Sequence, residues 1–79
     1  MLGNAKFILL GNNKTLIMVD NYTFSQHKHR YYYCSQRFKG CQAKLKLDQN
    51  KTQIVSLCNE HNHDPPVYKQ MDSGLYFKI

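Results

Sequence analysis

Residues 31–47 read YYYCSQRFKGCQAKLKL, and this stretch decides the fold of the chain. Residues 31–34 are aromatic and strand-like, and residues 38–40 (Phe-Lys-Gly) supply a turn. Residues 41–47 then alternate between small or apolar and polar side chains, the period of two that is typical of a half-buried strand. The stretch therefore predicts a β-hairpin with one apolar face and one polar, cationic face.

Further strand-like segments flank this hairpin. Residues 7–10 and 15–19 are apolar runs on either side of a Gly-Asn turn, which predicts a second hairpin. Residues 22–24 are either a short strand or aromatic anchors in a loop, residues 25–30 read as an exposed connection, and residues 52–57 read as the last strand. Pro65 and Pro66 end the regular structure, because proline cannot donate to a strand ladder. We expect a small all-β domain over residues 1–66, an antiparallel sheet of four or five strands, followed by an apolar tail over residues 67–79.

Composition points to a metal site. The chain has 79 residues, and a domain this small often needs a metal or disulfides to stay folded. Its three cysteines cannot all pair within one chain, and four histidines accompany them, which favours metal binding in a reducing compartment. No stretch is apolar enough to span a bilayer, so no membrane partner is expected. The net charge of +6 favours polyanionic partners, although charge alone is weak evidence.

Four residues are the candidate zinc ligands. Cys34 and Cys41 facing each other across the hairpin would place their Cβ atoms about 4.5–5.5 Å apart, a separation that suits a shared zinc or a disulfide. His61 and His63 decide between these, because residues i and i+2 of an extended strand point to the same face and both imidazoles can converge on one ion. Two thiolates and two imidazoles complete a tetrahedral site with no open position, which is structural rather than catalytic. We expect one zinc per chain.

Other polar residues compete for roles at this site. His27 and His29 lie close to the first cysteine, but their cationic neighbours disfavour a metal cation. Cys58 is close enough to replace a histidine ligand, but free cysteine is most often a small buried hydrophobe, so we expect it to pack in the core. Glu60 and Asp64 flank the histidines and are either hydrogen-bond acceptors for the ligand rings or solvated carboxylates.

The combination of Cys34-x6-Cys41 with His61-Asn62-His63 resembles a FLYWCH-type zinc finger over residues 7–66. The matching positions are Phe7, Leu16, Tyr22, Cys41-Gln42-Ala43-Lys44, His61-Asn62-His63 and Pro65-Pro66. The clearest departure is Tyr32, which stands where the family has a tryptophan two residues before the first cysteine. Tyrosine fills an aromatic core position but adds a hydroxyl that needs a partner.

The resemblance implies a four- or five-stranded antiparallel sheet with one Cys2His2 zinc, similar to the WRKY and GCM DNA-binding domains. FLYWCH domains occur in nuclear proteins of animals, and some bind DNA. Others are C-terminal modules of insect BTB chromatin and insulator proteins and bind protein partners; this chain, which continues only a short way past the finger, is more similar to that second group. The resemblance implies a nuclear, chromatin-associated module and leaves DNA and protein open as partners.

The alternation also predicts an outer face of the hairpin. With the two cysteines opposite each other, Tyr33 pairs with Gln42. Tyr31 then pairs with Lys44, and Tyr32 points inward. The candidate partner-binding residues on this face and in the flanking loops are Tyr31, Tyr33, Lys44, Lys46, Arg30, Arg37 and Lys39. The alternative is a solvated face on which lysine stems cover the tyrosine rings.

Two functions follow as expectations. The first is DNA recognition through the basic and aromatic outer face, and the second is docking onto proteins of a chromatin or insulator complex. An enzyme is not expected, because the site is closed and no nucleophile–base pair stands apart from the ligands, so there is no small-molecule substrate. The tail is expected either to fold back over its own domain or to dock on a partner or a second copy. Residues 75–79 read as a strand, although Val67, Met71 and Leu75 have helical spacing.

Overall fold

The computed structural model describes residues 5–51 and 53–79, so the expected domain start at residue 1 and the expected start of the last strand at Thr52 lie outside the described residues. The elements are β1 (Ala5–Leu9), β2 (Thr15–Val19), β3 (Tyr22–Lys28), β4 (Tyr31–Cys34), the 3-10 helix η1 (Arg37–Lys39), β5 (Lys44–Leu47), β6 (Ile54–Cys58), β7 (Tyr68–Gln70) and β8 (Tyr76–Lys78). No helix among the described residues is long and apolar enough to cross a membrane.

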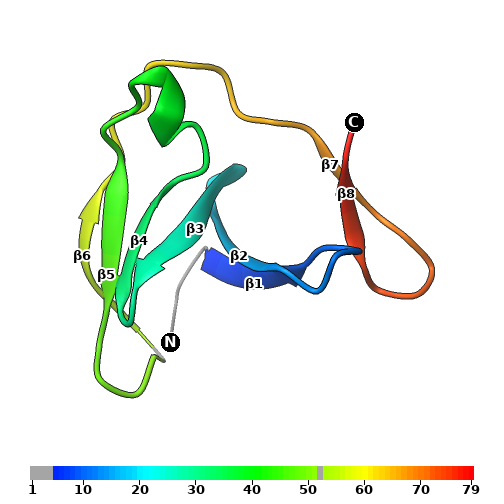
Figure 1. The fold of residues 1–79 in the computed structure, drawn as a ribbon, viewed down its shortest axis with the longest axis horizontal. Coiled ribbons are helices and arrows are strands. Elements are labelled where there is room, and N and C mark those ends of the chain that lie inside the picture. Colours follow the sequence, from blue (N-terminus) through cyan, green and yellow to red (C-terminus); the bar gives the residue numbers. More distant parts are fainter. Residues whose placement is uncertain (1–4, 52) are drawn as a thin grey trace.

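The first six strands form one antiparallel sheet in chain order, and β7 and β8 form a separate hairpin. The sheet is strongly curled, so that β1 and β2 run across the direction of β4 to β6 (Figure 1). The expected all-β antiparallel fold is confirmed, and the sheet has six strands where four or five were expected. The tight β2–β3 connection is Asp20-Asn21, whose two residues both have positive φ values (51° and 73°), as short hairpin turns require.

The expected exposed connection over residues 25–30 is wrong for its first part. Ser25 to Lys28 continue β3 and pair with β4, with a register shift between Gln26 and Lys28. Only the two residues His29 and Arg30 remain to connect the strands. The side chains of β3 are exposed from Gln26 onward, so this end of the strand can be polar. Its pairing with β4 forms between backbone groups and does not depend on apolar side chains.

The register of the β4–β5 hairpin differs from the expected one by two residues. Tyr33 pairs with Lys44 and Tyr31 with Lys46, while the amide of Cys34 donates to the carbonyl of Ala43 at 3.0 Å. A shift of two leaves every side chain on its expected face, because the side-chain period of a strand is also two. Cys41 therefore does not lie directly opposite Cys34 as expected, and η1 forms part of the loop between the two cysteines.

Strand β2 is buried on both faces and separates two apolar clusters. Ile17 and Val19 belong to the main cluster, which the inward residues of β3 to β5 complete. Members from those strands and the loops beside them are Phe24, Tyr32, Cys34, Cys41, Ala43, Leu45 and Leu47. Leu16 and Met18 point the other way and pack with Ile8 in a smaller cluster. The inward position of Tyr32 is confirmed, with 6 % of its surface exposed.

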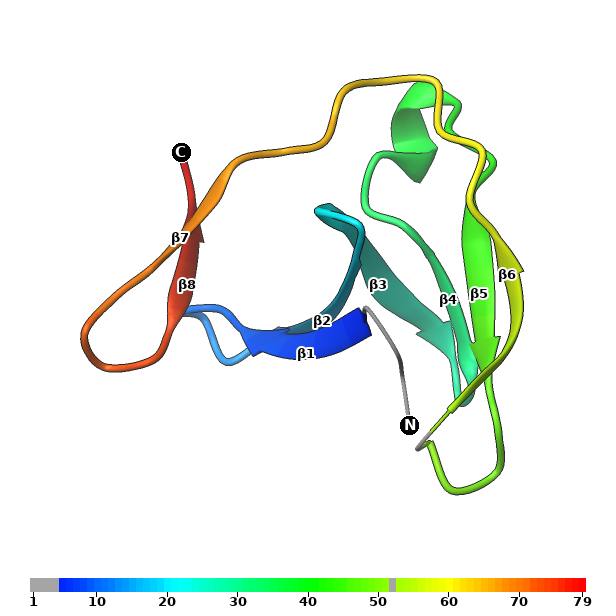
Figure 2. The same ribbon diagram turned by 180° about the vertical axis from the view of Figure 1, so that it is seen from behind.

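The tail folds back on its own domain. After β6 the chain crosses to the far side of the molecule and ends in the β7–β8 hairpin beside the β1–β2 loop (Figures 1 and 2). Tyr68 and Tyr76 pack against the smaller cluster, and Tyr76 makes a parallel bridge to Leu10. The strand expected over residues 75–79 is confirmed as β8, and the helical alternative is wrong because Gly74, with φ of 93°, lies in the hairpin turn.

Candidate metal centre

Two different local structures present the cysteine ligands. Cys34 is the last residue of β4, and η1 carries the chain from there to Cys41. The 3-10 turn ends at Gly40, whose left-handed conformation (φ 93°) and amide bond to the carbonyl of Arg37 (2.9 Å) turn the chain back toward β4. A side chain at this position would be strained, because L-residues avoid this φ. Both thiols are free and buried.

The histidines come from the connection after β6 rather than from a strand. His61 and His63 follow the end of β6 in an irregular segment, so the strand argument for their shared face does not apply. Their rings nevertheless converge, with centroids 5.3 Å apart and planes at 83°. The hydroxyl of Tyr22 donates to the carbonyl of His63 at 2.8 Å and fixes this segment against the start of β3.

The four side chains form one cluster with the geometry of a zinc site. The potential ligand atoms of Cys34, Cys41, His61 and His63 all lie within 4.8 Å of one another. His61 Nδ1 is 3.5 and 3.4 Å from the sulfurs of Cys34 and Cys41, and His63 Nε2 is 3.3 Å from the sulfur of Cys34. Tetrahedral coordination, with Zn–S near 2.3 Å and Zn–N near 2.0–2.1 Å, places sulfur and nitrogen about 3.5 Å apart. The cluster suits a single zinc ion.

The pKa values of the two cysteine thiols in the cluster are shifted in opposite directions. Burial raises the pKa of the Cys34 thiol to about 11. Burial acts in the same direction on Cys41, but hydrogen bonds from the backbone of Ala43 and Asn62 outweigh it, so that the pKa of this thiol is lowered. Burial, followed by the neighbouring His63, lowers the pKa of His61 and keeps its imidazole neutral, as a ligand must be. A bound zinc would supply the positive charge that stabilises both thiolates.

Each ligand ring is oriented by a hydrogen bond through its other nitrogen. His61 Nε2 lies 2.8 Å from the side-chain oxygen of Asn59, whose amide donates to the carboxylate of Asp20 at 3.3 Å. His63 Nδ1 lies 2.8 Å from the backbone carbonyl of Asp64. The carboxylates of Glu60 and Asp64 are not these acceptors. Sequence reasoning missed Asn59, because nothing in its spacing separates it from any other polar residue beside the histidines.

The competing ligands lie outside the cluster. His27 stacks on Tyr33 with ring centroids 4.4 Å apart, and His29 is exposed in the β3–β4 turn. The expected burial of Cys58 is wrong, because this residue is exposed on the edge strand β6, opposite Lys44. Directly paired residues point to the same face of a sheet, so Cys58 lies on the outward face with the exposed Lys44.

Several candidate binding residues gather on one face of the β4–β5 hairpin. The guanidinium of Arg37 lies 3.8 Å from the centroid of the Tyr33 ring, and the Lys46 ammonium lies 5.2 Å from that of Tyr31. We call Tyr31, Tyr33, Arg37, Lys44 and Lys46 the outer face. A shallow groove of about 270 Å³ runs between its tyrosines and lysines, with Ser56 of β6 at its border. Arg30 lies apart in the β3–β4 turn, and Lys39 lies at the end of η1.

A small all-β domain whose polar residues converge in a closed Cys2His2 cluster belongs to the class of zinc fingers, which bind partners rather than catalyse reactions. The FLYWCH zinc finger domain family matches residues 8–63, and the chain belongs to this family. The match begins one residue after Phe7 and ends at the second histidine ligand. No curated protein and no solved structure matches the chain. As a FLYWCH zinc finger, the protein is a non-catalytic module of the kind that binds nucleic acid or protein.

Proposed function

We propose that this zinc finger binds DNA through its outer face as the recognition module of a nuclear, chromatin-associated protein. The observation that carries the proposal is the arrangement of Arg37 and Lys46 on the rings of Tyr33 and Tyr31. Cations held on aromatic rings lose less conformational freedom on binding than free side chains, and arginine is well suited to phosphate contacts.

The charge around the outer face supports a polyanionic partner. None of the five acidic residues falls within β3, β4, η1 or β5. Lys44 is exposed beside the ordered cations, and no carboxylate pairs with Arg37 among residues 5–51 and 53–79. Backbone phosphates would neutralise this charge and release counterions, a contribution that supplies most non-specific DNA affinity.

The experiment is a titration of short duplex DNA at two salt concentrations, with the wild type and a Lys44→Glu/Lys46→Glu variant. We expect weaker binding by the variant and a salt dependence less steep by about one unit of slope for each lost phosphate contact. The control is Lys69→Glu/Lys78→Glu, which changes the net charge equally but lies in the exposed tail hairpin. Equal loss in both variants would show a general charge effect, and unchanged binding by the first variant would remove the outer face from the proposal.

A second candidate function, protein docking in a chromatin or insulator complex, is favoured by β6. This edge strand exposes Val55 and Leu57, with 57 % and 44 % of their surfaces accessible, and an unpaired edge can accept an added strand. The tail adds exposed Val67 and Ile79, which suit a partner or a second copy of the chain. Sizing and cross-linking of the wild type and of Val55→Lys test this function, since a lysine on the edge opposes strand addition. Identical self-association of both proteins would count against the edge as the docking site.

Either partner implies that the protein is nuclear, because chromatin DNA and chromatin proteins are located in the nucleus. A fluorescent fusion of the full chain tests it, and exclusion of the fusion from nuclei would contradict this part of the proposal.

A further inference from the structure

Phe38 is the most exposed large apolar side chain among the described residues, with 80 % of its surface accessible. It is the middle residue of η1, midway between the ligands Cys34 and Cys41. Leaving a phenylalanine in water forgoes the roughly 1.5–3 kcal/mol that burial of such a side chain contributes. A single exposed apolar residue is ordinary in itself, so the surroundings of Phe38 must carry the argument.

The backbone that carries Phe38 is rigid. The amides of Lys39 and Gly40 donate to the carbonyls of Gln36 and Arg37, both at 2.9 Å. The amide of Gln36 also points at the sulfur of Cys34, 3.5 Å away, and that of Cys41 bonds back to the carbonyl of Gln36 at 3.4 Å. Both ends of the turn are therefore tied to the metal cluster. Zinc binding would hold the backbone of Phe38 in place, which lowers the entropic cost of using this residue in a contact.

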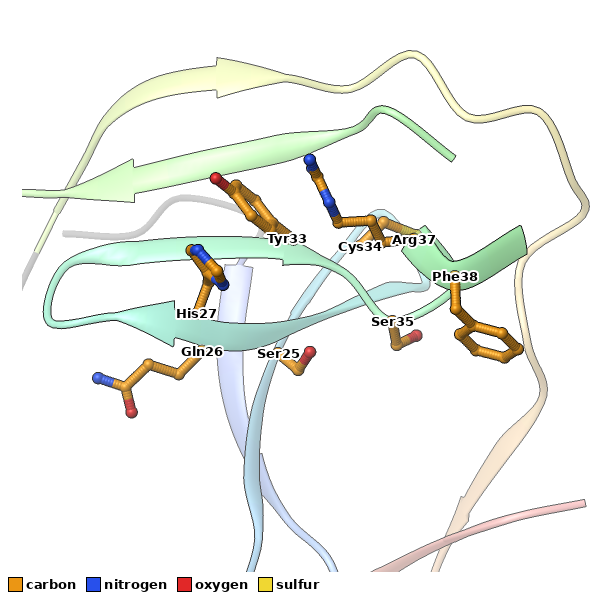
Figure 3. A pocket seen from close by; sticks show the side chains of 8 residues that line it. All are labelled: Ser25, Gln26, His27, Tyr33, Cys34, Ser35, Arg37 and Phe38. Atoms are coloured by element: carbon orange, nitrogen blue, oxygen red, sulfur yellow. The ribbon is translucent and has the colours of Figure 1, made fainter. Parts of the chain in front are cut away.

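The charges beside Phe38 select the partner. Arg37 precedes it and Lys39 follows it, with the Lys39 ammonium 5.7 Å from the centroid of the phenylalanine ring. Figure 3 shows the Arg37 side chain extending toward Tyr33 while the Phe38 ring projects away from η1 on the other side. One open pocket of about 210 Å³ is lined by residues that include Phe38, Arg37, Tyr33 and His27. An exposed apolar ring that is flanked in the sequence by two cations fits a polyanion that also offers flat apolar surfaces, which is the chemistry of nucleic acids.

The neighbouring aromatics favour a duplex over a single strand. Single-strand binding proteins present successive free rings on which bases stack. Tyr33 is covered by His27, 4.4 Å away between ring centroids, and by Arg37, and Tyr31 lies under Lys46. Phe38 is the isolated projecting ring at this end of the domain. Isolated apolar side chains flanked by cations are used as wedges that enter a base step and partly unstack it.

We propose that Phe38 enters a base step of duplex DNA while Arg37 and Lys39 contact the adjacent phosphates. This inference rests on the proposed DNA-binding function and adds to it a contact with the bases. The cations of the outer face then supply affinity along the backbone, and Phe38 makes the binding sensitive to how easily a base step opens.

The test uses short duplexes that carry a fluorescent adenine analogue whose emission rises when it is unstacked. We expect the wild-type zinc-loaded protein to raise the emission, and Phe38→Ala to abolish the rise and weaken duplex binding about tenfold or more. Phe38→Leu, which keeps an apolar wedge, should retain most of the rise. Phe77→Ala is the matched control, because Phe77 is an exposed phenylalanine of the tail hairpin, and should behave as wild type.

The possible results separate this inference from the proposed function. If Lys44→Glu/Lys46→Glu weakens binding but Phe38→Ala changes neither emission nor affinity, the wedge is overturned and DNA binding through the outer face stands. If Phe38→Ala weakens binding to the single strand alone, the ring stacks on unpaired bases and insertion into a duplex is overturned. If the wild type binds neither form of DNA, both proposals fall. Because Phe38 is exposed, its alanine variant should fold as the wild type does, and its zinc content verifies this.

Discussion

The ring of Tyr22 stacks face to face on the imidazole of His61, with centroids 3.6 Å apart and planes 4° apart. The same tyrosine meets the ring of His63 edge-on at 5.3 Å and donates its hydroxyl hydrogen to the carbonyl of that residue. Tyr22 opens β3 and is half-buried beside the main cluster. One side chain of the sheet thus positions both imidazole ligands, which lie in an irregular segment with no strand pairing of their own.

This relationship predicts unequal effects of two substitutions. Tyr22→Phe keeps the stack and loses one hydrogen bond, so the free energy of unfolding should fall by about 1 kcal/mol with zinc still bound. Tyr22→Ala removes the support of both rings, and zinc affinity should fall about 10- to 100-fold, as when other orienting partners are lost. Competition with a chromophoric chelator measures both affinities. Equal zinc affinity in Tyr22→Ala and wild type would contradict the role of the stack.

Chelation of zinc should unfold the domain. Structural zinc binding and folding are usually one event, and the main cluster includes both cysteine ligands. Cys34→Ser and His63→Ala should each abolish the folded state seen by circular dichroism. Cys58→Ser and His29→Ala are the controls and should retain one zinc, since both residues are exposed and lie outside the cluster. A folded, fully zinc-loaded Cys34→Ser protein would refute the ligand assignment.

The hydrogen bond from His61 to Asn59 should matter for affinity and not for the fold. Asn59→Ala removes the 2.8 Å acceptor of the ligand ring, and we expect zinc affinity to fall about 10- to 100-fold while the sheet stays intact. Glu60→Ala is the matched control, because this exposed residue is adjacent in sequence but does not orient the ring. A larger loss in Glu60→Ala than in Asn59→Ala would show that the carboxylate orients the ligand instead.

Zinc affinity should rise with pH around neutrality. The Cys34 thiol is protonated at neutral pH in the folded chain, where burial raises its pKa to about 11, and in the unfolded chain, where the ordinary pKa is about 8.5. Zinc binding must therefore displace this proton, which changes the affinity about tenfold per pH unit. His61 acts at lower pH. Its pKa in the folded chain is lowered from an ordinary value near 6.5, so below this pH the unfolded chain takes up the proton first. Stability from the neutral ring is lost as the pH falls through that lowered value. Zinc titrations in a series of buffers measure both effects, and an affinity independent of pH would contradict them.

Truncation after Pro66 should lower the melting temperature. The tail hairpin covers the cluster of Ile8, Leu16 and Met18 through Tyr68 and Tyr76, and its loss exposes part of these side chains. Partial exposure of three apolar residues corresponds to a few kcal/mol, because complete exposure of each costs about 1.5–3 kcal/mol. Thermal melting with a sizing measurement tests the prediction. An unchanged melt together with a change in size or partner binding would instead indicate a docking tail.

Much of the site was predictable because its chemistry is written in residue types and short spacings. The two thiols, the two imidazoles, the inward Tyr32 and the alternation of residues 41–47 follow from local sequence. The continuation of β3 beyond Phe24, through polar residues, was not predictable in this way. Its pairing with β4 forms between backbones, and a polar side chain does not report it. The exposure of Cys58 was missed for a related reason, because the sequence of β6 does not show that Cys58 pairs with the outward-facing Lys44.

The sequence by itself determined the class of fold, the four candidate ligands and which face of the β4–β5 hairpin enters the core, because a period of two survives even a register shift of two residues. Tertiary structure alone decided what surrounds them. The stack of Tyr22 on His61, the bond from Tyr22 to the carbonyl of His63 and the bond from Asn59 to Asp20 join residues from different segments. So does the packing of the tail on Ile8, Leu16 and Met18. These contacts depend on how the curled sheet brings its segments together, and local propensities do not encode that arrangement.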